Sequence, residues 1–205
     1  MAILVGGEGR RLGGVTKPLL LHPSGQRLID EIIATFESAT SELLILSTER
    51  TALALGDAGF GDRLVMDAGT GPAGALAAAA RATCCPWLVL AAGDLVRPSR
   101  ALLDRLLALR EPAKAALVSQ GGFLQPQLSV WPAAEVRSID IPEGRSLRSV
   151  AEQLAYVALS ADKLASSELA GLDGVNDPSD LLRFSIARPT GRNQIGTTHH
   201  PPRRS

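Results

Sequence analysis

The sequence predicts a single three-layer α/β/α domain with a mostly parallel sheet, and two observations carry that prediction. Short apolar runs alternate along the chain with segments whose apolar residues recur at helical spacing, which is the pattern of strands joined by crossover helices. The predicted strands are continuous apolar runs, as expected for strands that helices cover on both faces. A length of 205 residues fits one domain with a sizeable core.

The first half of the chain shows this alternation most clearly. In residues 28–36 the apolar side chains recur at helical spacing, while Asp30 and Glu31 fall on the opposite side. Ser99 is a suitable N-cap for a later helix. The expected strands are 3–5, 43–46, 64–66 and 87–91, and the expected helices are 28–36, a short one after Arg50, 74–82 and one that follows Ser99.

The second half is less regular. Residues 115–118 and 123–131 are strand-like, and the second of these is a candidate antiparallel strand. The expected later elements are helices over 146–154 and 161–169, a strand over 156–159 between them, and a last helix capped by Asp177 with Pro178 at its first position. From about Arg188 the composition turns to Thr, His, Pro and Arg without periodicity. We therefore expect a domain over 1–187 and a disordered tail over 188–205.

Composition excludes several classes of function. Lys plus Arg and Asp plus Glu both number 21, so no global charge attracts nucleic acid or a membrane surface. Aromatic residues are only 3%, which argues against a base-stacking platform. No apolar run reaches the roughly 18 residues of a spanning helix, and we expect a soluble, cytoplasmic protein. The adjacent Cys84 and Cys85 are expected to be small core residues before a strand rather than a disulfide or a zinc site.

A glycine-rich, cationic segment follows the first strand. Five glycines lie within the nine residues from Gly6 to Gly14, and Arg10, Arg11 and Lys17 add positive charge. Glycine has no Cβ, so its backbone can reach positive φ and bring N–H groups close to an anion. Successive N–H groups that turn inward form a nest for phosphate. The segment is therefore predicted to be a phosphate-binding loop.

Two well-known phosphate loops do not match this segment. A Walker A loop needs a Lys directly after its last glycine, followed by Ser or Thr, whereas Lys17 stands three residues beyond Gly14 and precedes Pro18. The dinucleotide fingerprint, counted from Gly7, would need a glycine where Leu12 stands. Both interpretations are excluded.

Polar residues follow the predicted strands at the points where each strand ends. In open Rossmann-like sheets ligands bind beyond the carboxyl ends of the strands, and there the chain places Ser47, Asp67 and Asp94. Mg²⁺ binds through carboxylate oxygens and substrate phosphates, so Asp94 is the metal candidate; the alternative is a surface Asp in the turn before Ser99. The small residues 67–74 allow a backbone to pass close to a ligand, although a tight strand-to-helix connection explains them almost as well.

The segment from Ile3 to Leu20 resembles the nucleotidyltransferase signature strand-G-G-x-G-x-R-[LM]-G-x-x-K, and residues 13–17 are most similar to molybdenum cofactor guanylyltransferases. The resemblance covers roughly residues 2–186. It implies that the triplet 4–6 contacts the nucleotide and that Asp67 touches GTP. The nucleotide-binding residues that it implies are Leu4, Val5, Gly6, Gly7, Lys17, Asp67 and Asp94.

Three later segments also resemble that family. Residues 71–74 look like its G-P-x-A-G, one residue short. Gln125 with Pro126, and Arg145 within 144–148, stand where the family has residues near the pterin. Asn176 resembles the second Asn of a late N-x-N motif, although helix capping by the next residue explains much of that segment. Gln125, Arg145 and Asn176 are therefore the implied substrate-binding residues.

The implied reaction is the transfer of GMP from GTP to the molybdopterin-bound molybdenum cofactor, with release of pyrophosphate. Asp94 would hold Mg²⁺, Lys17 would neutralise charge at the α-phosphate, and Arg11 with the amides of the glycine loop would stabilise the leaving pyrophosphate. The expected partners are GTP, the molybdopterin cofactor and the proteins that would deliver or receive it.

The sequence departs from the family pattern at three positions. Ser47 stands where the family commonly has Asn, Val96 replaces the proline of D-x-P, and Gly174 replaces the first Asn of N-x-N. These departures keep two alternatives open. The same fold would use CTP or another phosphorylated acceptor, or the chain would be a non-catalytic module that binds a nucleotide or docks a partner.

Overall fold

The computed structural model describes residues 1–6, 9–67 and 69–189. Gly7 and the part of the expected tail beyond residue 189 lie outside the described residues. None of the helices in the described part of the chain combines the length and the apolar composition needed to cross a bilayer.

A single seven-stranded sheet forms the centre of the fold, with strand order β3-β2-β1-β4-β6-β5-β7. Its strands are β1 (Ala2–Leu4), β2 (Leu44–Ser47), β3 (Leu64–Met66), β4 (Trp87–Ala92), β5 (Ala115–Gln120), β6 (Phe123–Pro132) and β7 (Tyr156–Ser160). β6 is antiparallel to β4 and β5, and every other pairing in the sheet is parallel. The mostly parallel sheet and the antiparallel strand near 123–131 are thus confirmed.

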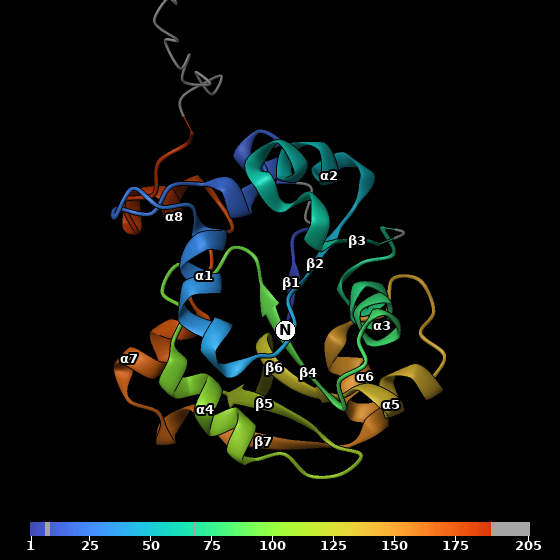
Figure 1. The fold of residues 1–205 in the computed structure, drawn as a ribbon. Coiled ribbons are helices and arrows are strands. Elements are labelled where there is room, and N and C mark those ends of the chain that lie inside the picture. The colour runs from blue at the N-terminus through green and yellow to red at the C-terminus, as the bar shows by residue number, and fades with distance from the viewer. Residues whose placement is uncertain (7–8, 68, 190–205) are drawn as a thin grey trace, which may run out of the picture.

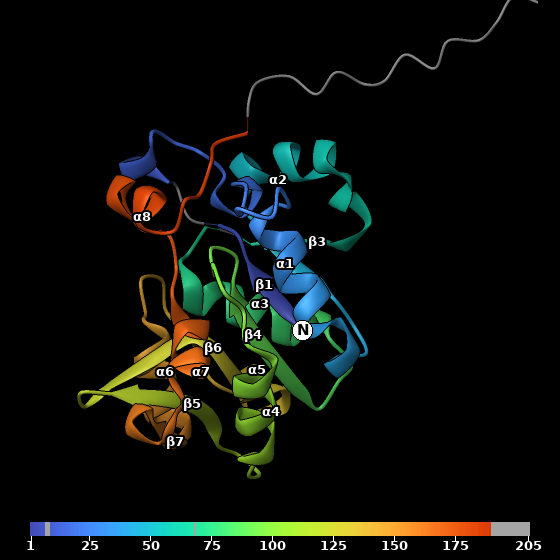
Figure 2. The same ribbon diagram turned by 90° about the vertical axis from the view of Figure 1, so that its left-hand side faces the viewer.

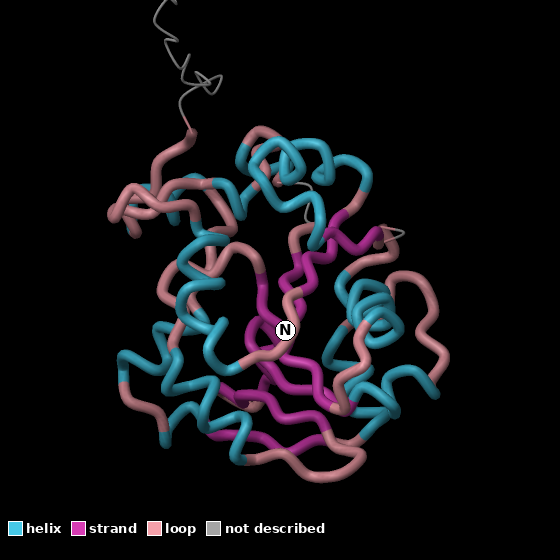
Figure 3. The backbone as a smooth tube through the Cα atoms, viewed as in Figure 1, coloured by secondary structure: helices cyan, strands magenta, loops and turns pink. Residues whose placement is uncertain are grey.

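Helices cover both faces of this sheet, which confirms the three-layer α/β/α architecture. They are α1 (Leu28–Phe36), α2 (Glu49–Leu55), α3 (Pro72–Ala82), α4 (Arg100–Ala108), α5 (Ala133–Ser138), α6 (Leu147–Leu154), α7 (Ser166–Leu169) and α8 (Pro178–Arg183). In Figure 1, α1, α4 and α7 lie on one side of the strands, and α3, α5 and α6 lie on the other. Figure 3 shows the strands as a central layer between helices.

Two apolar clusters fill the space between the layers. Because successive side chains of a strand point to opposite faces, Val89 and Ala91 belong to one cluster while Leu88 and Leu90 belong to the other. Both faces of β4 are therefore buried, which explains its continuous apolar run. Trp131 is fully buried in the second cluster and donates its Nε1–H to Ser129 Oγ at 2.8 Å.

The structure corrects several predicted element boundaries. α3 begins at Pro72 rather than at residue 74, and α5 was not expected. The expected helix over 161–169 is instead a 3₁₀ turn at Ala161–Lys163 followed by the short α7.

The expectation that Cys84 and Cys85 are core residues was wrong. Cys84 is exposed and Cys85 is half-buried in the connection between α3 and β4. The neighbours of Cys85 are polar: its N–H donates to Thr83 Oγ1 at 3.1 Å, and its Sγ lies 3.4 Å from Ser41 Oγ. This connection runs over the surface, so the two small residues are not covered.

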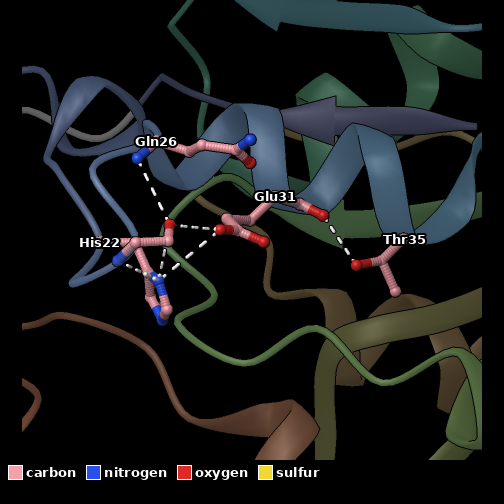
Figure 4. A network of polar contacts seen from close by, with 5 residues as sticks. His22, Gln26, Glu31 and Thr35 are labelled. Carbon is pink, nitrogen blue, oxygen red and sulfur yellow. Dashed lines mark hydrogen bonds and ion pairs between the residues drawn. The ribbon is translucent and has the colours of Figure 1, made fainter.

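A polar turn precedes α1 and is tied to that helix. Ser24 N donates to His22 Nδ1 at 3.2 Å, and Ser24 Oγ donates to Glu31 Oε1 at 2.6 Å (Figure 4). Leu21 also pairs with Ala187 through two backbone hydrogen bonds. The end of the described chain is therefore held beside the segment that precedes α1.

Candidate functional site

A cleft of about 590 Å³ opens where β1, β2, β3 and β4 end at their carboxyl edges. It is lined by Leu4, Val5, Gly6, Lys17, Pro18, Thr48, Arg50, Asp67, Gly69, Gly71, Pro72, Gly93 and Asp94. The cleft therefore collects segments that are up to 90 residues apart in the sequence. This is the edge of the sheet at which the sequence predicted a ligand.

Lys17 and Asp94 form an ion pair at the cleft. Lys17 Nζ donates to Asp94 Oδ2 at 2.8 Å, and the two side chains are 18% and 20% exposed. Gly93 fixes this approach, since its N–H donates to Leu4 O at 2.8 Å. A Cβ at Gly93 would lie 2.7 Å from Leu4 O and 2.9 Å from Pro18 Cγ. Only glycine lets the end of β4 pack this closely against β1 and the lysine-bearing turn.

Gly6 leaves space between two side chains in another part of the cleft. A Cβ there would lie 3.2 Å from Thr48 Cγ2 and 3.4 Å from Asp67 Oδ2. Asp67 is only 8% exposed, and its Oδ1 accepts a hydrogen bond from Gly69 N at 2.8 Å. Its second oxygen faces Gly6, where it can accept a hydrogen bond from a bound molecule.

The glycine loop is closed on itself. Gly9, Gly13 and Gly14 all have positive φ, of 55°, 74° and 80°, which strongly favours glycine over other residues. The N–H groups of Leu12 and Gly14 both donate to Gly9 O, at 2.8 and 2.9 Å. These two amides therefore hold the turn together. The expectation that the amides of the whole loop would serve the pyrophosphate was wrong for these two.

Arg11 does not line the cleft. It lies on a 3₁₀ turn, Arg10–Leu12, in which Leu12 is fully buried and Arg11 is exposed. Its charge acts on Asp177 at the start of α8. The hydrogen bonds from Ser179 do most to hold the pKa of Asp177 below its ordinary value, and Arg11 adds a smaller effect in the same direction. The structure thus places Arg11 near the start of α8 and outside the set of residues that line the cleft.

Gln125 lies in a second cavity, of about 380 Å³, between β6 and the segment around α7. This cavity is lined by Gln120, Gln125, Gln127, Ser166, Leu169, Ala170, Leu172 and Asp173. Gln127 Nε2 donates to Gln125 Oε1 at 3.2 Å, while the buried Gln127 Oε1 has no hydrogen-bond partner within the described chain. A buried acceptor without a partner is rare, and this oxygen lies too deep to be exposed in the cavity itself.

The segment 173–175 connects this second cavity to Asp94. Val96 N donates to Asp173 O at 2.9 Å, and Val175 N donates to Asp94 O at 3.1 Å. Figure 2 shows this part of the chain rising from α7 to α8. Asn176, the next residue, is exposed, and its side chain lies 3.4 Å from Gly174 O. Its backbone N–H donates to Asp180 Oδ2 at 2.7 Å, so Asn176 is held at the start of α8.

Arg145 lies apart from the other two predicted substrate residues. Its loop is placed near the start of α3, because Gly144 N donates to Thr70 O at 3.4 Å. Arg145 is half-buried, and its guanidinium approaches Asp140 O at 3.4 Å. None of the three predicted substrate residues lines the cleft: Gln125 lines the second cavity, and Asn176 and Arg145 line neither.

Sequence reasoning missed Thr48 and Arg50 and singled out Ser47 instead. Ser47 is fully buried, and its Oγ lies 2.9 Å from Thr51 Oγ1, so it does not reach the cleft. Thr48 and Arg50 come directly after β2 and line the cleft. The polar run 47–50 did indicate that this segment faces a ligand, but which of its residues lines the cleft depends on where the strand ends.

Comparison with known proteins agrees with this geometry. The model of the MobA-like NTP transferase domain matches residues 1–159. A protein of Pseudomonas putida named molybdenum cofactor guanylyltransferase is 32% identical over 183 residues, which cover 87% of this chain and 93% of that protein. A protein of the same name from Mesorhizobium japonicum is 31% identical over 198 residues, which cover 88% and 91%.

Solved structures share the fold at lower identity. The molybdopterin-guanine dinucleotide biosynthesis protein A of Archaeoglobus fulgidus has a TM-score of 0.69 at 22% identity, over 89% of this chain and 94% of that one. A nucleotidyl transferase of Methanothermobacter also has a TM-score of 0.69, at 20% identity, over 89% and 93%. The fold is thus that of the Rossmann-like nucleotidyltransferases. With the family model and the curated relatives, these findings show that the chain belongs to the MobA-like NTP transferase family and is a nucleotidyltransferase.

Proposed function

We propose that this chain is a molybdenum cofactor guanylyltransferase. It would transfer GMP from GTP to molybdopterin-bound molybdenum and release pyrophosphate. The observation that carries the proposal is the pairing of Lys17 with Asp94 in a cleft that Asp67 and the turn after β1 also border. The names of the relatives, which match along nearly their whole length, supply the substrates.

The nucleoside would bind around Gly6. The space between Thr48 and Asp67 is open only because Gly6 has no side chain. The free oxygen of the Asp67 carboxylate would accept hydrogen bonds from amino or hydroxyl groups of the nucleoside, and Leu4 and Val5 would contact it from β1 and the turn that follows. Gly7 is proposed to continue this contact along the chain.

Lys17 would bind the α-phosphate. Its ammonium is paired with Asp94. A nucleotide phosphate offers the ammonium a second anion, so Lys17 can neutralise the charge that develops at the α-phosphorus during transfer. Positioning and charge neutralisation are the main demands of such a reaction.

The residues present fit a Mg²⁺ ion held through Asp94. Mg²⁺ typically takes one or two carboxylates and completes its shell with substrate phosphates and water. Lys17 Nζ is bonded to Asp94 Oδ2 at 2.8 Å, so this ammonium would have to move toward a phosphate when the carboxylate holds the ion. Within the described residues no group of three or more His, Cys, Asp or Glu side chains forms a metal cage. The ion, when bound, would supply charge neutralisation between the phosphates.

The acceptor would approach from the second cavity. An oxygen of its terminal phosphate would form a bond to the α-phosphorus of GTP, while the bond from that phosphorus to the α–β bridging oxygen breaks and pyrophosphate leaves with the electron pair. Gln125 would hold the polar edge of the acceptor, and Asn176 directly follows the segment that connects this cavity to Asp94. Arg145 is proposed to contact the acceptor from the loop after α5.

Thermal-shift measurements with GTP, CTP, UTP and ATP in the presence of Mg²⁺ test the choice of nucleotide. The proposal expects the largest stabilisation from GTP, because at equal ligand concentration the melting temperature rises more for the ligand that binds the folded state more tightly. A preference for CTP would change the proposal to cytidylyl transfer on the same acceptor. The absence of any shift with all four nucleotides would overturn it.

A further inference from the structure

We infer that Arg50 binds the β- and γ-phosphates of the nucleotide and holds the pyrophosphate as it leaves. This inference rests on the proposed function and assigns a task in it that sequence reasoning had given to Arg11. Arg50 stands in the first turn of α2 and lines the cleft.

The geometry places the Arg50 guanidinium over the glycine loop. A Cβ built on Gly14 would lie 2.9 Å from Arg50 Nη2, so the guanidinium reaches across from α2 to that loop. Arg50 also lines the cleft together with Gly6 and Lys17. Its end group is therefore between the glycine loop and the space where a nucleotide would lie.

Of the two cations that line the cleft, Lys17 is assigned to the α-phosphate, which leaves Arg50 for the β- and γ-phosphates. The charged residues that line the cleft are Lys17, Arg50, Asp67 and Asp94. Lys17 is already paired with Asp94 at 2.8 Å, and no hydrogen bond or ion pair joins Arg50 to another residue in the described part of the chain. An exposed guanidinium with five N–H donors matches a pair of phosphate groups, which it can bind through two parallel hydrogen bonds.

The other arginines near the loop are less well placed. Arg11 is exposed on the side of the loop that faces Asp177, and it does not line the cleft. Arg188 approaches the loop from the end of the described chain, where its Nη1 would lie 3.9 Å from a Cβ on Gly13, and it does not line the cleft either. Arg50 is therefore the guanidinium that the fold directs to the phosphates.

The glycine loop then has a second function besides its tight turns. Gly14 needs glycine for its φ of 80°, and it also leaves the space that the Arg50 guanidinium occupies. Because the Leu12 and Gly14 amides are used inside the loop, a side chain must supply part of the charge that those amides were expected to give. α2 supplies it from outside the loop.

Competition binding against a fluorescent GTP analogue tests this inference, with Mg²⁺ present throughout. GTP, pyrophosphate and GMP are each titrated against the wild-type protein and the Arg50→Ala, Arg50→Lys and Arg81→Ala variants. Arg81 is a matched control, because it is an exposed arginine on a helix and does not line the cleft. Melting temperatures are compared to show that each variant is folded.

We expect Arg50→Ala to weaken the binding of GTP and of pyrophosphate by about 10- to 100-fold, which is the range for the loss of a pair of charge-assisted hydrogen bonds. The binding of GMP, which lacks both terminal phosphates, should be weakened by less than about twofold in the same comparison. Arg50→Lys should recover part of the affinity, and Arg81→Ala should behave as the wild type. Arg50→Ala should not lower the melting temperature.

Three other outcomes would overturn the inference. If GMP is weakened as much as GTP, Arg50 contacts the nucleoside rather than the terminal phosphates. If all three ligands bind Arg50→Ala as tightly as the wild type, Arg50 has no role in binding. If the wild-type protein itself binds neither GTP nor pyrophosphate, the proposed function fails and this inference fails with it, which distinguishes that case from a failure of Arg50 alone.

Discussion

Replacement of Gly93 by Ala tests whether close packing at the end of β4 places Asp94. The added Cβ would lie 2.7 Å from Leu4 O and 2.9 Å from both Pro18 Cγ and Val5 Cγ1, whereas ordinary contacts begin near 3.4 Å. The end of β4 must therefore move by about 0.5 to 0.7 Å. Such overpacking typically costs about 1–3 kcal/mol, and the hydrogen bond from Gly93 N to Leu4 O would lengthen as well.

The same movement would shift Asp94 relative to Lys17. Misplacement of a reacting group by about 1 Å can cost about 100-fold in rate, so we expect Gly93→Ala to lower kcat by about 10- to 100-fold. Urea unfolding measures the loss of stability, and steady-state turnover measures the loss of rate. If kcat falls while the urea curve shows that the variant is folded under the assay conditions, the loss of rate comes from the displacement of Asp94 and not from unfolding.

Gly56→Ala is the matched control for Gly93→Ala. A Cβ at Gly56 has nothing within 4 Å, and its backbone is in the right-handed helical region, with φ −60° and ψ −49°. We expect this variant to be as stable as the wild type or more stable by up to about 1 kcal/mol, with unchanged turnover. If Gly93→Ala has the free energy of unfolding and the kcat of the wild type, the reasoning about the end of β4 is wrong.

Three further substitutions test separate parts of the site. Asp94→Asn should abolish turnover while changing the Kd for GTP only a few-fold, and retained turnover would contradict its proposed metal role. Ser47→Ala should cost about 1 kcal/mol in urea unfolding, since it loses a buried hydrogen bond to Thr51. It should leave the order of nucleotide affinities unchanged, and an altered order would refute the placement of Ser47. Asp177→Asn tests the α8 cap: hydrogen bonds hold the Asp177 pKa below 3.8, so the carboxylate stabilises the fold above that pH and loses its effect as pH falls through the lowered pKa. The difference in urea midpoint between wild type and Asp177→Asn should be larger at pH 7 than at pH 2.5, and equal differences would contradict the assignment.

Most of the fold could be predicted because central strands such as β4 are buried on both faces. A run such as 87–91 is apolar without interruption since Leu88 and Val89 enter different clusters, and that is visible in the sequence. The later half was harder, because local residues do not say whether a strand runs parallel or antiparallel. The segment 161–169 has helical composition, yet the chain turns between Ala161–Lys163 and α7. Tertiary packing decided that boundary.

The site was predictable where it depends on strand ends and less so where it depends on side-chain direction. Asp67 and Asp94 follow apolar runs, and the structure brings both to the cleft with Lys17. Arg11 could not be placed from sequence, because the burial of Leu12 turns this part of the loop toward α8. Arg50 was missed for a similar reason. Its side chain reaches the glycine loop because α2 begins at Glu49, and the sequence does not show where that helix begins.

Pyrophosphate release in the presence of molybdopterin-bound molybdenum tests the central claim most directly. Purified protein is mixed with Mg²⁺ and each of the four nucleoside triphosphates, with and without the acceptor, and pyrophosphate and the dinucleotide product are both measured. We predict that GTP with the acceptor yields one pyrophosphate for each guanine dinucleotide formed, and that neither product appears without the acceptor. If GTP binds but no nucleotide yields pyrophosphate with the acceptor present, the chain is a nucleotide-binding or docking module, and the roles proposed for Lys17 and Asp94 are wrong.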